Sequence, residues 1–292
     1  MPRRGTPTKR PIPYVQRVVA VASGKGGVGK STIAVNLALA LRATSHEAIG
    51  RPARVGLLDL DVYGPSVPKL MGLEDIGEPD LTPGGALVPM TNHGIPCMSM
   101  GFLLPPSTSG SNADTPVVWR GLMVMKAVQQ LLFDVDWREP SCAPLDVLVV
   151  DMPPGTGDVA LSLCQLVCVD GAVVVSTPQE VALSDARKGI TMFHKVHVPI
   201  FGLVLNMSHF VAPDTGVTYP LFGPAEAFEG LAQRVGVPVL GRVPLEMHVS
   251  TGGDRGIPQV ILPDTAENAV GSASKRVFLD MARNTWNQLP IT

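Results

Sequence analysis

Short runs of apolar, mostly β-branched residues recur along the chain, and longer stretches with helical spacing separate them. Runs this apolar are typical of strands buried on both faces of a parallel sheet, because helical crossovers cover each side of such a sheet. We expect strands at residues 17–22, 54–58, 146–150, 171–176 and 201–205. Helices are expected at residues 31–41, 120–133, 185–196, 224–235 and 265–286, the last interrupted by Gly271. This alternation predicts an α/β fold: a doubly wound, mostly parallel sheet with helices on both faces.

The domain organisation follows from the chain length and from the stretches that lack any period. The chain has 292 residues, of which 45% are hydrophobic, enough for one large α/β domain. We expect a single domain over residues 17–292, with a mobile surface loop at 104–116, which is rich in proline, serine and glycine. Residues 1–16 contain four basic residues and no acidic one, namely Arg3, Arg4, Lys9 and Arg10. This segment is either a flexible, solvated basic tail or the stub of a mitochondrial targeting sequence.

Charge and cysteine content exclude several classes of protein. The formal net charge is −2 and the pI about 6.3, so the chain has no overall basic field to hold nucleic acid or an anionic membrane. No apolar run approaches the roughly 18 residues that span a bilayer. We therefore expect no nucleic-acid partner and no stable membrane insertion. The four cysteines, in a chain of this length, do not indicate a disulfide scaffold.

A glycine-rich segment links the first predicted strand to the first predicted helix. It reads Gly24, Lys25, Gly26, Gly27, Val28, Gly29, Lys30, Ser31, Thr32, and its first eight residues fit the pattern G-x-x-x-x-G-K-[ST]. Glycines let backbone N–H groups wrap phosphate oxygens, and the following helix adds the partial positive charge of its N-terminus. Lys30 is expected to neutralise the β- and γ-phosphates of a nucleotide, and the Ser31 hydroxyl to ligate Mg²⁺. The segment predicts an ATP site.

Carboxylates stand at the ends of two further predicted strands, where a Mg²⁺–nucleotide site needs them. Asp59 and Asp61 end the strand in "VGLLDLD", and Asp151 ends the strand in "LDVLVVD". Asp151 has the Walker B form, a carboxylate that holds Mg²⁺ through water. We expect Asp59 to support the Mg²⁺ shell or the loop, and Asp61 to orient the attacking water. Gly155 follows two prolines, and its lack of a side chain would let a backbone N–H approach the γ-phosphate. The predicted chemistry is phosphoryl transfer to water.

With Lys25 in place, the loop resembles the deviant Walker A motif of the MinD/ParA/nitrogenase-iron-protein class. In that class the first lysine reaches across a nucleotide sandwich dimer to the phosphates of the partner subunit. The resemblance implies that Lys25 acts in trans, as an arginine finger does, and that the protein works as a homodimer.

Longer segments are similar to the Mrp/NBP family of iron–sulfur cluster carriers over residues 15 to about 265. The segments include "LLDLDVYGPSVPKLMGL", "CMSMGFL", "VVDMPPGTGDVALSL" and "GLVLNMSHF". Others, such as "RGLMVM" and "HKVHVPIFGLVLNMS", look most like the mitochondrial branch that serves assembly of respiratory complex I. The resemblance implies Asn206 at the nucleotide base, iron–sulfur client proteins (complex I subunits), and a place in the mitochondrial matrix, with the cytoplasm as the alternative. It also implies a [4Fe-4S] cluster between two subunits, bound by a C-x-x-C shortly after N-M-S.

The chain departs from this family at the cluster site. Ala212 and Thr215 stand where the two cysteines belong. Alanine has no donor atom, and a threonine hydroxyl is a hard, neutral oxygen that rarely competes with thiolate for iron. No iron–sulfur ligand is identified, and the family's usual cluster site cannot form here.

Other residues that could bind a metal or a client have simpler interpretations. Cys164 and Cys168 are four apart on a predicted helix among leucines, which favours a core position over metal binding. His194 and His197 flank a helix end and are expected at the surface. The methionines of "CMSMGF" and "RGLMVM" indicate core packing, with an exposed client groove as the alternative. Trp119 and Arg120 could lie at a dimer seam.

Three functions remain open from the sequence. The first is a slow Mg-ATP-dependent dimeric ATPase of the iron–sulfur carrier family, acting in cluster delivery or complex I assembly. The second is a positioning ATPase of the ParA/MinD type, which would need a basic surface or an amphipathic terminal helix. Residues 270–286 offer only a weak version of such a helix, and packing explains it more simply. The third is a nucleotide-gated scaffold with little hydrolysis.

Overall fold

The computed structural model of the chain describes residues 9–46, 49–62, 64–74, 76–103, 121–139, 141–263 and 272–290. Several sequence predictions lie outside these residues: the loop at 104–116, Trp119 and Arg120, residues 1–8 of the basic segment, and residues 265–271 of the last predicted helix.

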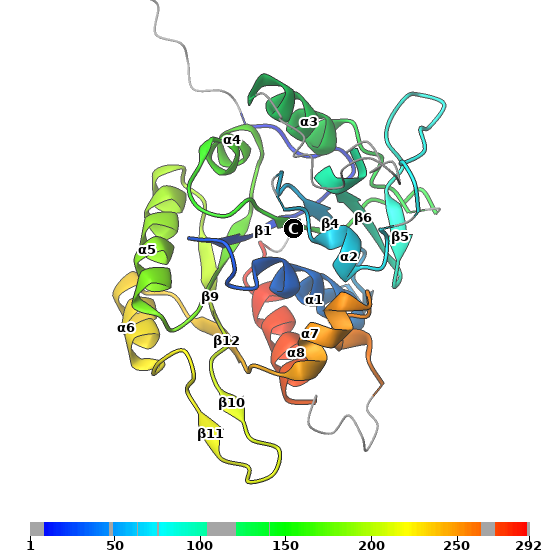
Figure 1. Cartoon of the computed structure of the whole chain (residues 1–292). Helices are drawn as coiled ribbons and strands as arrows, with labels where there is room; N and C mark the ends of the chain where they lie inside the picture. Colours follow the sequence, from blue (N-terminus) through cyan, green and yellow to red (C-terminus); the bar gives the residue numbers. More distant parts are fainter. Residues whose placement is uncertain are drawn as a thin grey trace, which may run out of the picture.

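An eight-stranded sheet forms the centre of the molecule (Figure 1). Its strand order is β12-β9-β8-β1-β7-β4-β6-β5, and every neighbouring pair is parallel except β5 with β6. The strands are β1 (Val18–Ser23), β4 (Val55–Asp59), β5 (Met90–Asn92), β6 (Ile95–Ser99), β7 (Val147–Asp151), β8 (Gly171–Ser176), β9 (Ile200–Asn206) and β12 (Val239–Val243). Two hairpins stand apart from the sheet: β2 (Ser45–His46) with β3 (Arg51–Pro52), and β10 (Phe210–Val211) with β11 (Thr218–Tyr219).

Helices cover both faces of the sheet, as the alternating pattern predicts. On one face α1 packs against β1, β4 and β7, and α8 packs against α1 and β12. On the other face α5 packs against β8 and β1, and α6 against α5 and β9 (Figure 1). The helices are α1 (Lys30–Ala43), α2 (Val67–Leu70), α3 (Gly121–Phe133), α4 (Asp158–Leu166), α5 (Glu180–Lys195), α6 (Glu226–Val235), α7 (Met247–Asp254) and α8 (Ser272–Trp286), with 3₁₀ turns η1 (Met100–Leu103) and η2 (Gln259–Ile261).

The core consists of the β-branched and leucine side chains of the central strands and of the helix faces that cover them. Every residue of β1, β4, β7 and β8 is buried, which is why these strands show no alternation of polar and apolar residues. The five predicted strands correspond to β1, β4, β7, β8 and β9, each shifted by one residue at most. α5 begins at Glu180, five residues before the predicted start.

The apolar side of α8 is a packing face, as predicted. Phe278 and Met281 are fully buried in the core. No helix among the described residues is both long and apolar enough to cross a bilayer.

Residues 9–16 differ from the predicted solvated tail. The Arg10 N–H donates to the Leu166 carbonyl at 2.8 Å, and the Cys168 N–H donates back to the Arg10 carbonyl at 3.1 Å. The Arg10 guanidinium lies over the Phe133 ring, 4.4 Å from its centroid. Ile12 is buried. The two backbone hydrogen bonds hold residues 9–16 against the end of α4, so this part of the basic segment is packed on the domain.

The same contacts correct the interpretation of the cysteine pair. α4 ends at Leu166, and Val167 is extended (φ −112°, ψ 145°) where the chain pairs with Arg10. Cys164 is buried as predicted, but Cys168 lies beyond the helix and is exposed. The two thiols therefore do not share a helical face.

Candidate active site

The glycine-rich segment forms the turn between β1 and α1, at the carboxyl edge of the parallel strands. Its Gly27 and Gly29 have φ angles of 78° and 81°, in the left-handed region that favours glycine. A Cβ placed on Gly24 would lie 2.1 Å from the Asp185 carbonyl carbon in α5. A Cβ on Gly29 would lie 2.2 Å from Asn206 Nδ2. The turn is therefore held against α5 on one side and β9 on the other, and glycine makes both approaches possible.

A cleft of about 330 Å³ opens above this turn. Such a position, outside the carboxyl ends of parallel strands, is where open α/β sheets bind ligands. The residues that line the cleft come from the end of β1, the turn, the start of α1, the segments after β4 and β7, and α2: Ser23, Lys25, Gly26, Gly27, Gly29, Lys30, Ser31, Thr32, Asp61, Gly64, Ser66, Leu70 and Pro154.

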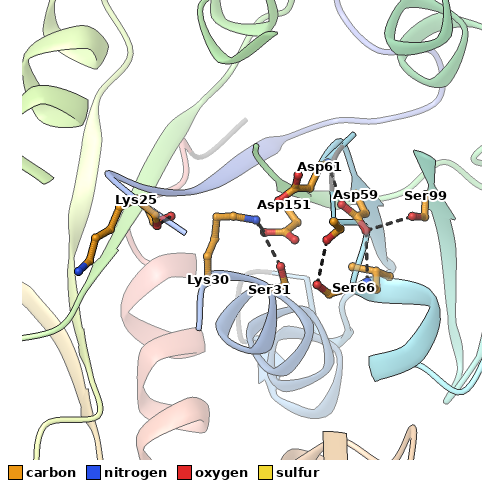
Figure 2. A network of polar contacts seen from close by, with 11 residues as sticks. Lys25, Lys30, Ser31, Asp59, Asp61, Ser66, Ser99 and Asp151 are labelled. Carbon is orange, nitrogen blue, oxygen red and sulfur yellow. Dashed lines mark hydrogen bonds and ion pairs between the residues drawn. The ribbon is translucent and has the colours of Figure 1, made fainter. Parts of the chain in front are cut away.

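At the bottom of this region the Lys30 ammonium is paired with the Asp151 carboxylate, with 2.5 Å between Nζ and Oδ1 (Figure 2). Lys30 is 6% exposed and Asp151 is fully buried. Lys30 Nζ also lies 3.3 Å from Ser31 Oγ. The second carboxylate oxygen of Asp151 is buried and accepts no hydrogen bond from the described residues. Burial raises the pKa of the Asp151 carboxyl, and the Lys30 charge acts against that rise.

This unpartnered oxygen beside a serine hydroxyl fits a hard divalent cation. Mg²⁺ takes oxygen ligands and is usually held by one or two carboxylates together with waters and phosphate oxygens. A buried carboxylate oxygen without a donor costs free energy that such a shell would offset. Ser31 and Asp151 are thus the residues present that suit Mg²⁺.

Asp59 lies beside Asp151 but has different partners. Its Oδ1 accepts a hydrogen bond from the Asp61 N–H at 2.9 Å, and its Oδ2 accepts from the Val67 N–H at 3.2 Å and from Ser99 Oγ at 3.0 Å. Asp59 is fully buried and is absent from the cleft lining. Burial, and then the neighbouring Asp151 charge, raise the pKa of Asp59 to about 7. Of the two roles expected for Asp59, these contacts favour holding the loop over a place in the Mg²⁺ shell.

Asp61 and Lys25 lie on the wall of the cleft, as the sequence suggested, and both are half-exposed. Figure 2 shows the Lys25 side chain pointing away from Lys30 and from the three aspartates. The Lys25 carbonyl accepts a hydrogen bond from Ser23 Oγ at 2.9 Å, which fixes the backbone of the turn while leaving the ammonium directed outward.

Gly155 and Asn206 make contacts that the sequence did not predict. Gly155 has a φ of 82°, and its N–H donates to the Ser23 carbonyl at 2.9 Å. The expected approach of that N–H to a γ-phosphate requires this bond to break. Asn206 Nδ2 donates to the Val28 carbonyl at 2.7 Å and is buried, so Asn206 supports the turn itself. A role at the nucleotide base stays a prediction.

Sequence reasoning missed Ser99, Ser66 and Leu70. Ser66 and Leu70 line the cleft because they stand at the two ends of α2, Ser66 directly before it and Leu70 as its last residue. Ser99 ends β6, a strand that the sequence did not predict because Pro96 interrupts its apolar run. The polar residue at the end of that run, directly before a glycine-containing turn, was the available signal.

Comparison with known proteins is consistent with this geometry. Residues 14–284 match the family described as NUBPL iron-transfer P-loop NTPase, within ParA. The iron–sulfur cluster transfer protein NUBPL of Mus musculus is 49% identical over 286 residues, covering 98% of this chain and 82% of that protein. The chain belongs to this NUBPL family of P-loop NTPases. An Arabidopsis thaliana member, the mitochondrial iron–sulfur protein required for NADH dehydrogenase, is 45% identical over 280 residues, covering 96% of this chain and 81% of that protein.

A solved structure supports the nucleotide-binding character of the fold. The nucleotide-binding protein of Archaeoglobus fulgidus, in complex with ADP, superposes with a TM-score of 0.69 at 34% sequence identity. The match covers 86% of this chain and 90% of that protein. The chain is therefore a nucleotide-binding P-loop NTPase of the NUBPL family.

Within this NUBPL-family chain, Ala212 and Thr215 lie in the turn of the β10–β11 hairpin, which projects from the sheet (Figure 1). The Ala212 N–H donates to the Val217 carbonyl at 2.9 Å, and the Gly216 N–H donates to the Ala212 carbonyl at 2.8 Å. Thr215 is exposed. The turn is closed by its own backbone and presents no thiolate.

The remaining candidate ligands are scattered. His194 and His197 are both exposed, as predicted. Met98 and Met100 are buried in the core, whereas Met123 on α3 is 57% exposed, so the core interpretation holds for the first pair and fails for Met123. Among the described residues there is no group of three or more His, Cys, Asp or Glu side chains that could hold a metal ion.

Proposed function

We propose that this protein is a Mg-ATP-dependent ATPase that works as a homodimer and takes part in iron–sulfur cluster delivery during assembly of respiratory complex I in the mitochondrial matrix. The observation that carries the ATPase part is the buried Lys30–Asp151 pair under the glycine-rich turn, with one carboxylate oxygen unpartnered. The delivery part is supported by the iron–sulfur and NADH dehydrogenase functions named for the mouse and Arabidopsis relatives. The cytoplasm is the alternative location.

The residues of the cleft have different roles in the proposed phosphoryl transfer. Backbone N–H groups from Gly24 to Thr32 surround the phosphates, and Lys30 moves its charge from Asp151 to the β- and γ-phosphates. Ser31 and Asp151 would hold Mg²⁺, which would supply charge neutralisation at the transferred phosphoryl group. Asp61, on the cleft wall, orients the attacking water. Asn206, whose side-chain amide lies against Gly29, is the residue that we assign to the nucleotide base.

Lys25 supplies the reason for dimerisation. Its side chain points away from the cation–carboxylate cluster of its own subunit (Figure 2). A lysine whose side chain points outward can reach a nucleotide on a facing subunit and stabilise charge there, as an arginine finger does. Two subunits related by a two-fold axis would each give one Lys25 to the other.

Cluster handling in this protein does not use the hairpin positions that the family resemblance would assign to ligands. Ala212 has no donor atom, and Thr215 offers a neutral hydroxyl. The cluster, as cargo, is therefore bound by the client or by a partner while the ATP dimer holds the two together.

Variants of the two lysines test the ATPase assignment. Lys30→Ala is expected to abolish nucleotide binding, measured by calorimetric titration with ATP and Mg²⁺. Lys25→Ala is expected to bind ATP as the wild type does, and to be impaired in hydrolysis and in nucleotide-dependent dimerisation, measured by phosphate release and light scattering. Hydrolysis by Lys25→Ala at the wild-type rate would show that the in-trans role is wrong. Wild-type ATP affinity in Lys30→Ala would show that the nucleotide does not bind at the site proposed around Lys30.

A second candidate function follows from Ala212 and Thr215. A protein without cluster ligands at the hairpin can serve as a nucleotide-gated scaffold with little hydrolysis, and steady-state turnover separates it from the first candidate. Anaerobic cluster reconstitution with iron counting, on this chain and on the Ala212→Cys/Thr215→Cys variant, tests the ligand argument. We expect a cluster on the double variant only, and a stable cluster on the unmodified chain would contradict it.

A positioning ATPase of the ParA/MinD type is less well supported, because the apolar side of α8 is used in the core. Co-pelleting with DNA or anionic liposomes in the presence of ATP would reveal it.

A further inference from the structure

A row of three buried polar side chains crosses the carboxyl edge of the sheet. Asp151 is the register partner of Asp59 across β7 and β4, and Asp59 is the register partner of Ser99 across β4 and β6. All three are fully buried. The first faces Lys30, and the other two form a separate arrangement with no cation bonded to it in the described residues (Figure 2).

Asp59 is the junction of this arrangement. Its carboxylate receives donors from three different segments: the Asp61 N–H just after β4, the Val67 N–H at the start of α2, and the Ser99 hydroxyl at the end of β6. A buried carboxylate is stable only when its lone pairs meet donors. The three donors therefore hold Asp59, and Asp59 in turn holds the two segments that carry Asp61 and α2.

The direction of the Ser99 hydroxyl is fixed by its second contact. Ser99 Oγ accepts a hydrogen bond from the Gly101 N–H at 3.0 Å. When Asp59 is ionised, the proton of Ser99 is therefore directed at Asp59 Oδ2, 3.0 Å away. Without this hydroxyl, the Val67 N–H would be the one donor left to Oδ2 among the described residues, and its distance of 3.2 Å is the longest of the three.

We propose that Ser99 is a positioning residue for the reaction in the cleft: through Asp59 it fixes the backbone of Asp61 and the start of α2. Both segments line the cleft, through Asp61, Ser66 and Leu70. Ser99 itself is absent from the lining and acts only through Asp59. The expected effect of Ser99 on the reaction rate rests on the proposed ATPase function. Its expected effect on the backbone at Asp61 and α2 does not.

The kinetic test compares Ser99→Ala with Ser99→Thr, which keeps the hydroxyl. Ser176→Ala is the matched control, because Ser176 is also a buried serine ending a strand, and its hydroxyl bonds the Thr177 carbonyl instead. We expect Ser99→Ala to lower kcat about tenfold with ATP affinity within about twofold of wild type, because small displacements of an orienting group reduce rate more than binding. Ser99→Thr should recover most of the rate, and Ser176→Ala should match wild type. A Ser99→Ala enzyme with unchanged kcat, or with kcat and affinity reduced alike, would overturn the proposal.

A second measurement does not depend on turnover. Hydrogen exchange at the Asp61 and Val67 amides should accelerate in Ser99→Ala and stay at the wild-type rate in Ser99→Thr and Ser176→Ala. If wild-type protein hydrolyses no ATP but this pattern is found, the proposed function fails and the positioning role of Ser99 stands. If both amides exchange as in wild type, the positioning role fails whatever the ATPase activity. Should Ser99→Ala not fold, Ser99→Cys, which offers a weaker donor of similar size, replaces it with the same expected order.

Discussion

The contact of the glycine-rich turn with α5 leads to a sharp prediction about two neighbouring glycines. A Cβ on Gly24 would lie 2.1 Å from the Asp185 carbonyl carbon and 2.4 Å from the Ala186 nitrogen. Carbon atoms in contact are normally about 3.5–4.0 Å apart, and the atoms met here are helix backbone, which cannot rotate away. A Cβ on Gly26 would meet nothing within 4 Å. Gly24→Ala therefore forces the turn away from α5, whereas Gly26→Ala does not.

Overpacking of this kind costs about 1–3 kcal/mol or more, and surface changes cost within about 0.5 kcal/mol. For a chain of this size, Gly24→Ala should lower Tm by roughly 2–6 °C and Gly26→Ala by about 1 °C at most. The assay is thermal unfolding without nucleotide, followed by circular dichroism, so that phosphate contacts of either glycine do not enter. If the two variants unfold at the same temperature, the packing of the turn on α5 is not as described.

Other perturbations of the site have expected results of similar precision. Lys30→Ala leaves Asp151 buried without its cation, and should lower the free energy of unfolding by about 3–5 kcal/mol in urea titrations, against about 0.5 kcal/mol or less for the half-exposed Lys25→Ala. The contribution of Asp59 to the unfolding free energy should fall as pH rises from about 4 to about 7, because the folded protein keeps the Asp59 proton up to about pH 7 while the unfolded chain releases it near 3.8. Asp59 alone contributes at most about 1.4 kcal/mol per pH unit to the slope. The raised pKa of Asp151 acts in the same direction, so Asp59→Asn should reduce the slope by up to the Asp59 contribution, and an equally steep slope in that variant would contradict the assignment. Asn206→Ala removes the donor to the Val28 carbonyl and should cost about 1–3 kcal/mol, with a stability equal to wild type refuting the supporting role.

The sheet and the glycine-rich turn could be predicted because both depend on patterns of residues close together in the sequence. Strands such as β8 are continuous β-branched runs, and the turn needs glycine at fixed spacing. Two strands were not predicted. Pro96 interrupts the apolar run of β6, which forms a strand by pairing with β4. Gly241 and Arg242 interrupt the apolar run of β12, which forms a strand by pairing with β9.

Some residues of the site could likewise be predicted from local patterns, and others could not. Lys30 and Asp151 could be placed from their motifs, since Asp151 ends β7 and the turn before Lys30 follows β1 at the same edge of the sheet. The partners of Asp59 could not, because its contact with Ser99 depends on the register between β4 and β6. The packing of residues 9–16 likewise arises from backbone pairing at the end of α4, which leaves no mark in the composition of a basic segment.

The central claim, a dimeric ATPase in which Lys25 serves the partner's nucleotide, is tested most directly by mixing two inactive variants. In a dimer of one Lys25→Ala subunit and one Asp61→Ala subunit, the nucleotide on the Lys25→Ala subunit has its own Asp61 and receives Lys25 from its partner. At protein concentrations high enough to force random pairing despite the weakened pairing of Lys25→Ala subunits, equal amounts should restore about one quarter of wild-type ATP hydrolysis, because half the dimers are mixed and each has one complete site. No recovery in the mixture, with both variants still binding ATP and pairing with each other, would contradict the claim.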